Sequence, residues 1–600
     1  MKGMYTPFVL LLFAVTGCLG NQKIGSASGH GLARRGLDNP GPDNFAWHRY
    51  PTVVALGDYV YIDGGEISQK SNGTDITTNG TQSYASYSVT STLSLSLKDS
   101  WTNRTVQLQS IPKQAPSLDQ QIYWSDPSNG AGAFYTWGGM AAGSATPPTN
   151  EQWLFNADGS GGGMWSQVSQ SDYRQFAALK QPVGSAFTQG NQIGYALGGQ
   201  ATSKTDNTIQ KADPGYALPG LVSYNFQTGD WNNVTTTTDF GGYGTSLNGR
   251  AEFVPFGPNG LLVFLGGSES QVDATDSSIV PTNWNSITLH DPVTGKWYKQ
   301  KTSGMRPVLL ERFCSVGVQG PNNTYEIYIY GGNSDQIEGT SPDVHVLSLP
   351  GFIFFDAGSL GTPRADHACA VVGKGKRQML SYGGVNGGPG LRNPTTTADP
   401  WKQGLGIYDM SEMKWTDSYD PDAADYESPA KVKDWYDQGN LNNVKWDSPE
   451  LKGLIINGSI YGTSGDSPPA NNSSGGSGTS ARKIGAIVGG TVGGVVVVAI
   501  AITTMFLLRR RRQRRESQST IVETLNEYRP EPWPKDSPRM RSTTPGTLIS
   551  SPTPVEPVEI CGISRGELPA GEVELAYELP ASPARTPRIR PELPDRTYTS

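Results

Sequence analysis

Six times between residues 60 and 384, a short hydrophobic segment of this chain ends in a pair of glycines. The pairs are Gly64-Gly65, Gly138-Gly139, Gly198-Gly199, Gly266-Gly267, Gly331-Gly332 and Gly383-Gly384. A unit that recurs in this way is typical of a β-propeller, in which each unit makes one four-stranded blade. The repeat therefore predicts an all-β, six-bladed propeller over residues 45–420.

Each glycine pair belongs to a pattern of four short strands. A second apolar strand follows it after an insert of variable length, and a tight turn that often contains glycine leads into another strand. That last strand usually carries a tryptophan, at Trp101, Trp165, Trp231, Trp297 and Trp415. One more strand lies upstream of each pair, which completes a four-stranded antiparallel blade.

This pattern resembles the kelch repeat over residues 45–420. Arg364 and His367 open a first strand, and an aromatic residue stands three positions before the first glycine of four pairs. These aromatic residues are Tyr61, Tyr135, Tyr195 and Tyr328. The fourth unit has Val263 at that position, and the fifth has Phe352 and Phe354 in place of tryptophan. The resemblance implies a kelch-type propeller in spite of these departures.

The longest inserts lie between the second and third strands of a unit. They span residues 66–90, 200–220, 268–284 and 385–403. Because successive strands alternate in direction, these four loops share one face of the propeller, which we call the loop face. Loops held by a rigid scaffold often carry recognition, and aromatic residues and arginine are favoured in binding hot spots. The predicted binding residues are Trp284, Trp401, Arg392, Tyr216 and Tyr243; the alternative for Trp284 and Trp401 is packing onto their own blades.

The segments outside the propeller predict a type I membrane protein. Residues 1–20 are typical of a signal peptide. The uncharged stretch 484–508 is long enough to be a transmembrane helix, and residues 509–515 form a basic stop-transfer segment that marks the cytoplasmic side. The other segments are a post-propeller segment at 421–461, a stalk rich in Gly, Ser and Asn at 462–483 and a disordered cytoplasmic tail at 516–600. This topology places the propeller outside the plasma membrane.

Sequons for N-glycosylation all precede the predicted membrane span, as this topology requires. The candidate acceptors are Asn72, Asn79, Asn103, Asn233, Asn322, Asn457, Asn471 and Asn472.

Two cysteines, Cys314 and Cys369, lie in the predicted propeller. An alignment of Arg312 with His367 places the cysteines at equivalent points of neighbouring first strands, where a disulfide could form in an oxidising compartment. The alternative is two buried free thiols.

The residues that an enzyme on this scaffold would need are scarce. A copper enzyme similar to galactose oxidase requires a pair of histidines among its ligands, and the five histidines of this chain, His30, His48, His290, His345 and His367, show no metal-ligand spacing. No nucleophile motif or phosphate loop occurs, so we expect no catalytic residues, no metal and no cofactor. Arg250, Arg312 and Arg364 are expected near the mouth of the central channel, either tying loops together or binding a ligand.

Charge and the terminal segments suggest further partners. A net charge of −7 argues against nucleic acid. Glycines at 485, 489, 490, 493 and 494 have spacings that favour a homodimer through the membrane helix, although glycine is common in such helices. Repeated Glu-Leu-Pro and Ser/Thr-Pro motifs in the tail suggest a cytosolic partner controlled by phosphorylation, or only low-complexity drift.

Taken together, these features resemble those of fungal single-pass membrane-anchored kelch proteins. The resulting hypothesis is a non-enzymatic cell-surface scaffold that binds wall glycan or a surface protein outside the cell and cortical or signalling partners inside. The alternatives are a membrane-tethered extracellular enzyme similar to galactose oxidase and a cortical landmark for polarised growth. The sequence leaves open whether residues 45–50 or residues 430–455 close the ring.

Overall fold

The computed structural model describes residues 38–457, except for 71–72, 75–76, 79–80, 83–85, 144, 211–214, 273–278, 359–360 and 389–397. The predicted signal peptide, stalk, membrane span, basic segment and tail lie outside these residues.

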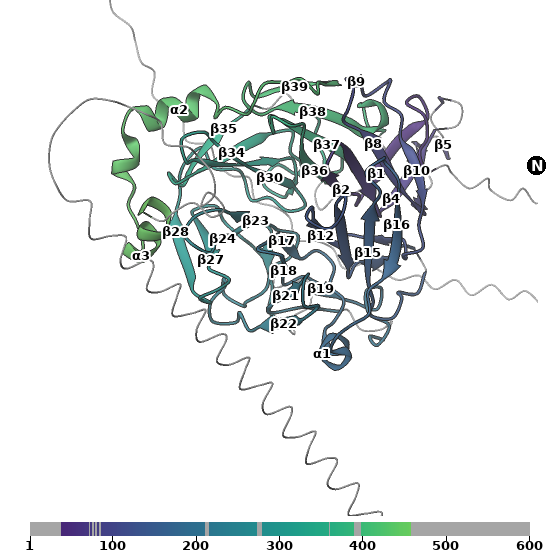
Figure 1. Ribbon diagram of the computed structural model, residues 1–600, viewed down its shortest axis with the longest axis horizontal. Helices are drawn as coiled ribbons and strands as arrows, with labels where there is room; N and C mark the ends of the chain where they lie inside the picture. Colours follow the sequence, from purple (N-terminus) through teal and green to yellow (C-terminus); the bar gives the residue numbers. More distant parts are fainter. Residues whose placement is uncertain are drawn as a thin grey trace, which may run out of the picture. The chain divides into compact units, whose positions relative to one another are not determined.

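Five antiparallel sheets form separate blades around a central axis (Figure 1). The first four are β2 (Thr52–Leu56), β3 (Tyr59–Asp63), β8 (Ser91–Ser96) and β10 (Gln109–Pro112); β12 (Ile122–Asp126), β13 (Ala133–Trp137), β15 (Gln152–Ala157) and β16 (Gly163–Gln167); β17 (Ala186–Gly190), β18 (Ile193–Leu197), β21 (Leu221–Asn225) and β22 (Trp231–Val234); and β23 (Arg250–Val254), β24 (Leu261–Leu265), β27 (Ser286–His290) and β28 (Trp297–Lys301). The fifth is β30 (Cys314–Gln319), β31 (Tyr325–Tyr330), β34 (Val344–Leu349) and β35 (Ile353–Asp356), with the short β29 (Ser303–Gly304) added in parallel.

The strands around the sixth glycine pair do not form a separate blade. β36 (Ala365–Val372), β37 (Gln378–Val385), β38 (Leu405–Asp409) and β39 (Lys414–Thr416) belong to a seven-stranded sheet with β1 (Phe45–Arg49), β4 (Glu66–Gln69) and β7 (Tyr87–Ser88). The prediction of six blades is therefore wrong: five sheets stand alone, and the last repeat is merged with strands from the start of the chain.

The contact made by the glycine pair explains this merger. The second glycine of the earlier pairs donates one backbone hydrogen bond to the next repeat, for example Gly139 to Pro182 O at 2.8 Å and Gly199 to Ser246 O at 2.7 Å. At the sixth pair, β37 runs through the glycines, and Gly384 pairs with His48 of β1, which also pairs with β4. A single contact thus becomes part of a continuous ladder.

The predicted fold class also included a membrane-spanning helix. Within the part of the chain that the structure describes, no helix is both long enough and apolar enough to cross a membrane. That part of the fold prediction is not supported.

The inner strands β2, β12, β17, β23, β30 and β36 surround a central channel (Figure 1). β36 lies beside β2, so the last repeat meets the first. β1, over residues 45–49, makes the strand pairing between them. Residues 430–455 instead form short helices outside the sheets, where Leu451 and Ile455 pack into the core next to β24 and β27.

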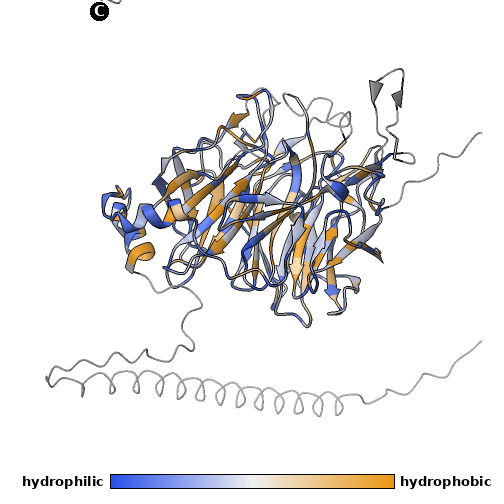
Figure 2. Cartoon of the chain, turned by 90° about the horizontal axis from the view of Figure 1, so that it is seen from above, coloured by the Kyte–Doolittle hydropathy of each residue, from blue (hydrophilic) through white to orange (hydrophobic). Residues whose placement is uncertain are grey.

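Hydrophobic and hydrophilic residues alternate along many strands (Figure 2), as expected for sheets packed face to face. The glycine pairs let the backbones of neighbouring repeats approach. Gly138 has a φ of +69°, and a Cβ there would lie 2.6 Å from Pro182 O. Any other residue at this position would clash with the next repeat.

Short strands and helices decorate the sheets. On or beside the loop face are β5 (Thr77–Thr78), β6 (Thr81–Gln82), β11 (Leu118–Asp119), β14 (Met140–Ala141), β19 (Gln200–Ala201), β20 (Tyr216–Ala217), β25 (Ser268–Glu269), β26 (Val280–Pro281), β32 (Asn333–Ser334) and β33 (Gly339–Thr340). Elsewhere are β9 (Trp101–Thr102), β40 (Ser418–Tyr419), α1 (Tyr173–Ala178), η3 (Lys402–Gly404), α2 (Ala430–Asp437), η4 (Asn440–Asn443), α3 (Pro449–Lys452) and η5 (Gly453–Asn457).

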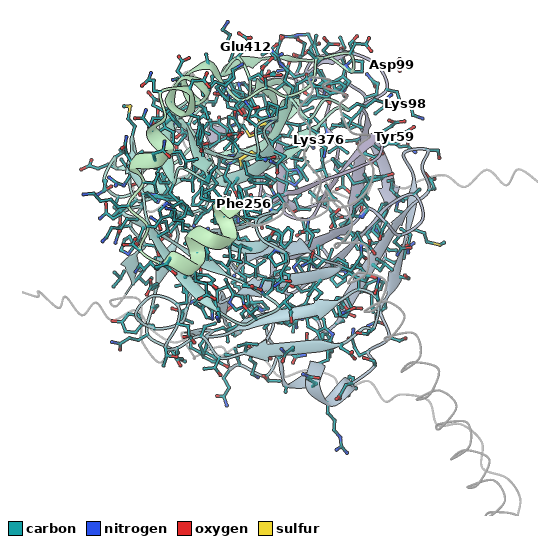
Figure 3. The ribbon with its side chains drawn as sticks, turned by 60° about the vertical axis from the view of Figure 1, so that its left-hand side comes forward. Tyr59, Lys98, Asp99, Phe256, Lys376 and Glu412 are labelled. Carbon is teal, nitrogen blue, oxygen red and sulfur yellow. A yellow bond between two sulfur atoms is a disulfide. The ribbon has the colours of Figure 1, made fainter. Side chains whose placement is uncertain are left out.

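The face opposite the loop face carries the tight turns between strands, and we call it the turn face. Tyr59, Lys98 and Asp99 lie together on it (Figure 3), with the Lys98 ammonium 5.0 Å from the centre of the Tyr59 ring. Its turns are short, so the longer inserts are concentrated on the loop face.

Candidate functional site

A ring of six residues, which we call the collar, surrounds the loop-face end of the channel. The collar consists of Tyr50, Gln120, Gly184, Asn248, Arg312 and Asp366, and each has a φ between 51° and 71°. Five of the six are not glycine, although this conformation is uncommon for other residues and costs backbone strain. Strain of this kind often accompanies a functional position.

Backbone hydrogen bonds link successive collar residues. Tyr50 N–H donates to Asp366 O at 2.8 Å, Asp366 to Arg312 O at 3.1 Å, Arg312 to Asn248 O at 2.9 Å, and Asn248 to Gly184 O at 2.7 Å. Because these donors are used within the collar, recognition at the mouth depends on the side chains.

Two cavities meet at the collar. One fills the channel between the inner strands and has a volume of about 350 Å³. The other, which we call the loop-face pocket, has a volume of about 320 Å³ and is lined by loop residues that include Gln200, Ser270 and Ile279. Tyr50, Gln120, Asn248 and Arg312 line both cavities. The collar therefore separates a pocket open to partners from an inner chamber.

Charged groups at the collar are largely paired. Arg312 forms a salt bridge with Asp366 at 3.2 Å, and Arg49 Nε donates to Glu66 at 2.7 Å. Burial, reinforced by the charge of Glu66, raises the pKa of nearby Asp119 to about 8. The mouth therefore carries little unbalanced charge in direct contact with the collar.

Inside the channel, β23 contributes Arg250 and Glu252. Ser315 Oγ donates to Glu252 at 2.6 Å, and burial raises the pKa of Glu252 to about 7. Arg250 lines the same cavity. Its guanidinium makes no hydrogen bond or salt bridge with any other residue that the structure describes, and burial lowers its pKa.

The three arginines expected at equivalent points of the channel mouth occupy three different places. In each repeat, the residue just before the glycine pair lies opposite one residue of the inner strand. That residue is Arg250 in the fourth repeat, but Cys314 in the fifth and Ala368 in the sixth, so Arg250 is not equivalent to Arg312 or Arg364. Arg312 lies in the collar. Arg364 is buried and binds Asp399 through both terminal nitrogens, each at 3.1 Å. Of the three, Arg250 alone has no carboxylate within salt-bridge distance among the described residues, and the nearest acidic groups that act on it are Asp366 and Glu252.

A disulfide joins Cys314 and Cys369, whose Cα atoms are 5.7 Å apart, across the neighbouring inner strands β30 and β36. The strand registers place the two cysteines one residue apart rather than at equivalent points, since Cys369 pairs with Ser381 and not with Tyr382. His367 lies beside them, and the three residues could in principle ligate a metal. The disulfide occupies both sulfurs, so the group does not fit a metal ion.

The predicted binding residues are scattered. Trp284 is only 2% exposed, and its indole donates to Val308 O at 2.7 Å. Trp401 is half-buried under the guanidinium of Arg364, which lies 3.8 Å from the ring centre. Tyr216 is the residue before Ala217, which lines the loop-face pocket. The hydroxyl of Tyr243 lies 3.5 Å from Gln271 Nε2. Arg392 lies outside the described residues.

The described histidines belong to different strands: β1, β27, β34 and β36. His48 lies 3.0 Å from the hydroxyl of Tyr382 and 2.9 Å from Gly64 O, and His290 packs 4.2 Å from the ring of Trp297. His30 lies outside the described residues. These contacts give the described histidines structural surroundings in separate parts of the propeller.

Three sequons can be placed in the structure. Asn233 and Asn322 are exposed, whereas Asn103 is 8% exposed and its amide donates to Leu405 O at 3.1 Å. The side chains of the other candidate acceptors, at positions 72, 79, 457, 471 and 472, lie outside the described part of the chain.

Sequence alone did not reveal the collar residues Tyr50, Gln120 and Asn248. The one available signal is positional: each stands two residues before an inner strand. Their residue types are unrelated, so no motif marks them.

The glycine-pair repeats, the four-stranded sheets and the central channel define a β-propeller protein. The chain is similar to a kelch repeat-containing protein of Arthroderma benhamiae, with 25% identity over 452 residues. The similarity covers 68% of this chain and 62% of that protein. No protein-family model matches the chain.

Proposed function

We propose that this protein is a non-enzymatic cell-surface binding protein that holds a surface protein or wall glycan on its loop face. The observation that carries the proposal is the loop-face pocket, where two of the long inserts, 200–220 and 268–284, meet the collar. Gln120, Gln200 and Asn248 supply hydrogen-bonding groups there. A concave site with a few polar groups on a rigid scaffold suits a specific partner.

Apolar side chains beside this pocket support a macromolecular partner. Ile279 is 43% exposed and Val280 is 51% exposed. Ile279 lines the pocket, so the exposed apolar surface adjoins the polar groups. This combination resembles the mixed composition of protein interfaces.

The disulfide supports an extracellular site of action. Cys314 and Cys369 are joined within the wall of the channel, and disulfides persist mainly in oxidising compartments. The exposed sequons at Asn233 and Asn322 are compatible with passage through the secretory pathway.

A cell-binding experiment tests the proposal. Labelled full-length protein is added to intact cells of its source species, and retention is measured for the wild type, Val280→Asp and Val293→Asp. Val293 is a matched control because it is 67% exposed in the β27–β28 turn on the turn face. Val280→Asp is expected to reduce retention about tenfold or more, and Val293→Asp to have little effect.

Pretreatment of the cells identifies the class of partner. Loss of retention after protease treatment indicates a protein, and loss after glycanase treatment indicates a wall glycan. Equal retention of the two variants would contradict a loop-face site.

A further inference from the structure

We infer that the channel contains a second binding site, in which Arg250 binds a small hydroxylated carboxylate such as a sugar acid. This site lies on the inner side of the collar and is separate from the proposed partner site on the loop face.

Arg250 carries the inference because it is a channel arginine without a hydrogen-bonded or ion-paired partner among the described residues; the carboxylates of Asp366 and Glu252 act on it only at longer range. Among the described residues, Arg49, Arg312, Arg364 and Arg377 each form a salt bridge with a carboxylate. Arg250 forms no salt bridge, and its guanidinium donates no hydrogen bond to another residue in the described part of the chain.

The chemistry of arginine makes this exception informative. An arginine remains charged in proteins, so it cannot avoid the cost of burial by losing its proton. A buried charge normally requires a partner of opposite charge. The surface of Arg250 that remains accessible faces the channel cavity that it lines, and an anion in that cavity would supply the partner.

The size of the cavity favours an organic anion. Its volume of about 350 Å³ falls within the range of small-molecule sites, which starts at roughly 300 Å³. A carboxylate also matches the planar fork of the guanidinium, since both can form two parallel hydrogen bonds. A single halide ion would leave most of the cavity unfilled.

The lining of the cavity favours a hydroxylated ligand. On one side, β12, β17 and β30 contribute Ser125, Thr188, Gln189 and Ser315. On the other side, the adjacent strands β2 and β36 contribute mainly aliphatic residues, with Val53–Ala55 and Ala370–Val371 among them. Sugar acids combine hydroxyl groups with apolar C–H faces, which suits a wall of this mixed character.

Glu252 does not prevent a carboxylate from binding. Its carboxyl group already accepts a hydrogen bond from Ser315, and burial raises its pKa to about 7, so its negative charge is only partial at neutral pH. The other charged pair near the cavity, Arg312 and Asp366, is internally neutralised.

Isothermal titration calorimetry on the full-length protein tests the inference. The probes are D-glucuronate, D-gluconate and L-malate, with D-glucose as the uncharged control and inorganic phosphate as the anion without carbon. At least one of the three acids is expected to bind with one-to-one stoichiometry and at least about tenfold more tightly than glucose or phosphate, since the guanidinium and the hydroxyl groups act together.

Arg250→Gln is expected to weaken that binding about tenfold or more, because it removes the charge but keeps a polar side chain. Arg174→Gln, on the exposed helix α1, is the matched control and is expected to bind like the wild type. If Arg250→Gln does not fold, Thr188→Val tests the same cavity from another strand.

Three results would overturn the inference: no saturable binding of any acid, equal binding of phosphate and the acids, or equal affinity in the wild type and the channel variants. Retention of Arg250→Gln on cells is measured in parallel. If only the channel site is wrong, no acid binds but the variants at the loop face still lose retention on cells. If only the partner site is wrong, the acid binds but Val280→Asp is retained like the wild type.

Discussion

Two arginines show how differently this propeller treats a positive charge away from the outer surface. Arg364 lies in a closed anchor made with Asp399 and Trp401, where both terminal nitrogens meet the carboxylate and the indole covers the guanidinium. Arg250 lines the channel without such partners in the described part of the chain. The first region leaves no charge for a ligand to neutralise, whereas the second leaves a guanidinium facing the cavity without an ion pair among the described residues. Arginine as a residue type therefore does not indicate function, but the completeness of its surroundings does.

The largest expected effect comes from opening the closed anchor. Arg364→Met is expected to lower the free energy of unfolding by about 3–5 kcal/mol, because it leaves the buried carboxylate of Asp399 unpaired. Arg250→Met breaks no salt bridge that the structure describes and is expected to change stability by less than about 1 kcal/mol. Urea denaturation of the full-length proteins at pH 7 measures both.

A double variant checks the cause of this loss. Arg364→Met combined with Asp399→Leu removes both charges and is expected to recover much of the stability, since apolar replacement of a buried pair is often close to neutral. Equal losses in Arg364→Met and Arg250→Met would show that the two regions do not differ.

The same contrast shows how far sequence can lead. The glycine pairs located the second strand of every repeat, because their spacing and the preceding aromatic residues recur along the chain. Matching arginines by residue type failed, however. Arg250, Arg312 and Arg364 differ in their position relative to the glycine pairs, and only the strand register reveals that position.

Long-range pairing explains the other differences. β1 is a short strand whose partners, β4 and β37, come from opposite ends of the propeller sequence, so nothing local shows that the last repeat merges with the first. The collar was also hidden. Tyr50, Gln120 and Arg312 are not residue types that signal a positive φ, and the backbone hydrogen bonds of Tyr50 and Arg312 join residues that are far apart in the sequence.

A second, smaller effect should distinguish the channel from the exposed surface through pH. The pKa of Glu252 is about 7 in the folded protein, against 4.5 for the ordinary group, because of burial. The folded state therefore holds a proton that the unfolded state has lost, and stability falls as pH rises from about 4.5 to about 7. We expect Glu252 to cost about 1–3 kcal/mol at pH 8 relative to pH 4.5.

Glu252→Gln should remove this part of the pH dependence. Urea denaturation at pH 4.5 and pH 8 measures the change, and Glu412→Gln is the control because that side chain is 57% exposed on the turn face (Figure 3). Burial also raises the pKa of Asp119 to about 8, so some pH dependence is expected to remain. An unchanged pH profile in Glu252→Gln would contradict the view that the channel holds incompletely satisfied charge.

The smallest effect applies the same comparison to asparagine. Asn103 is buried and its amide donates to Leu405 O, whereas Asn233 and Asn322 are exposed. In protein from a secretory host, glycans are therefore expected on Asn233 and Asn322 but not on Asn103, because a glycan on Asn103 would have to displace its buried hydrogen bond. Peptide mapping by mass spectrometry after enzymatic deglycosylation measures the occupancy.

Asn103→Gln should leave the mass of the glycans unchanged and cost about 1 kcal/mol of stability, while Asn233→Gln should remove one glycan with little effect on stability. Folded protein with a glycan on Asn103 would show that a completed buried contact does not keep this side chain from modification, and the distinction drawn from the two arginines would then not extend to other polar residues.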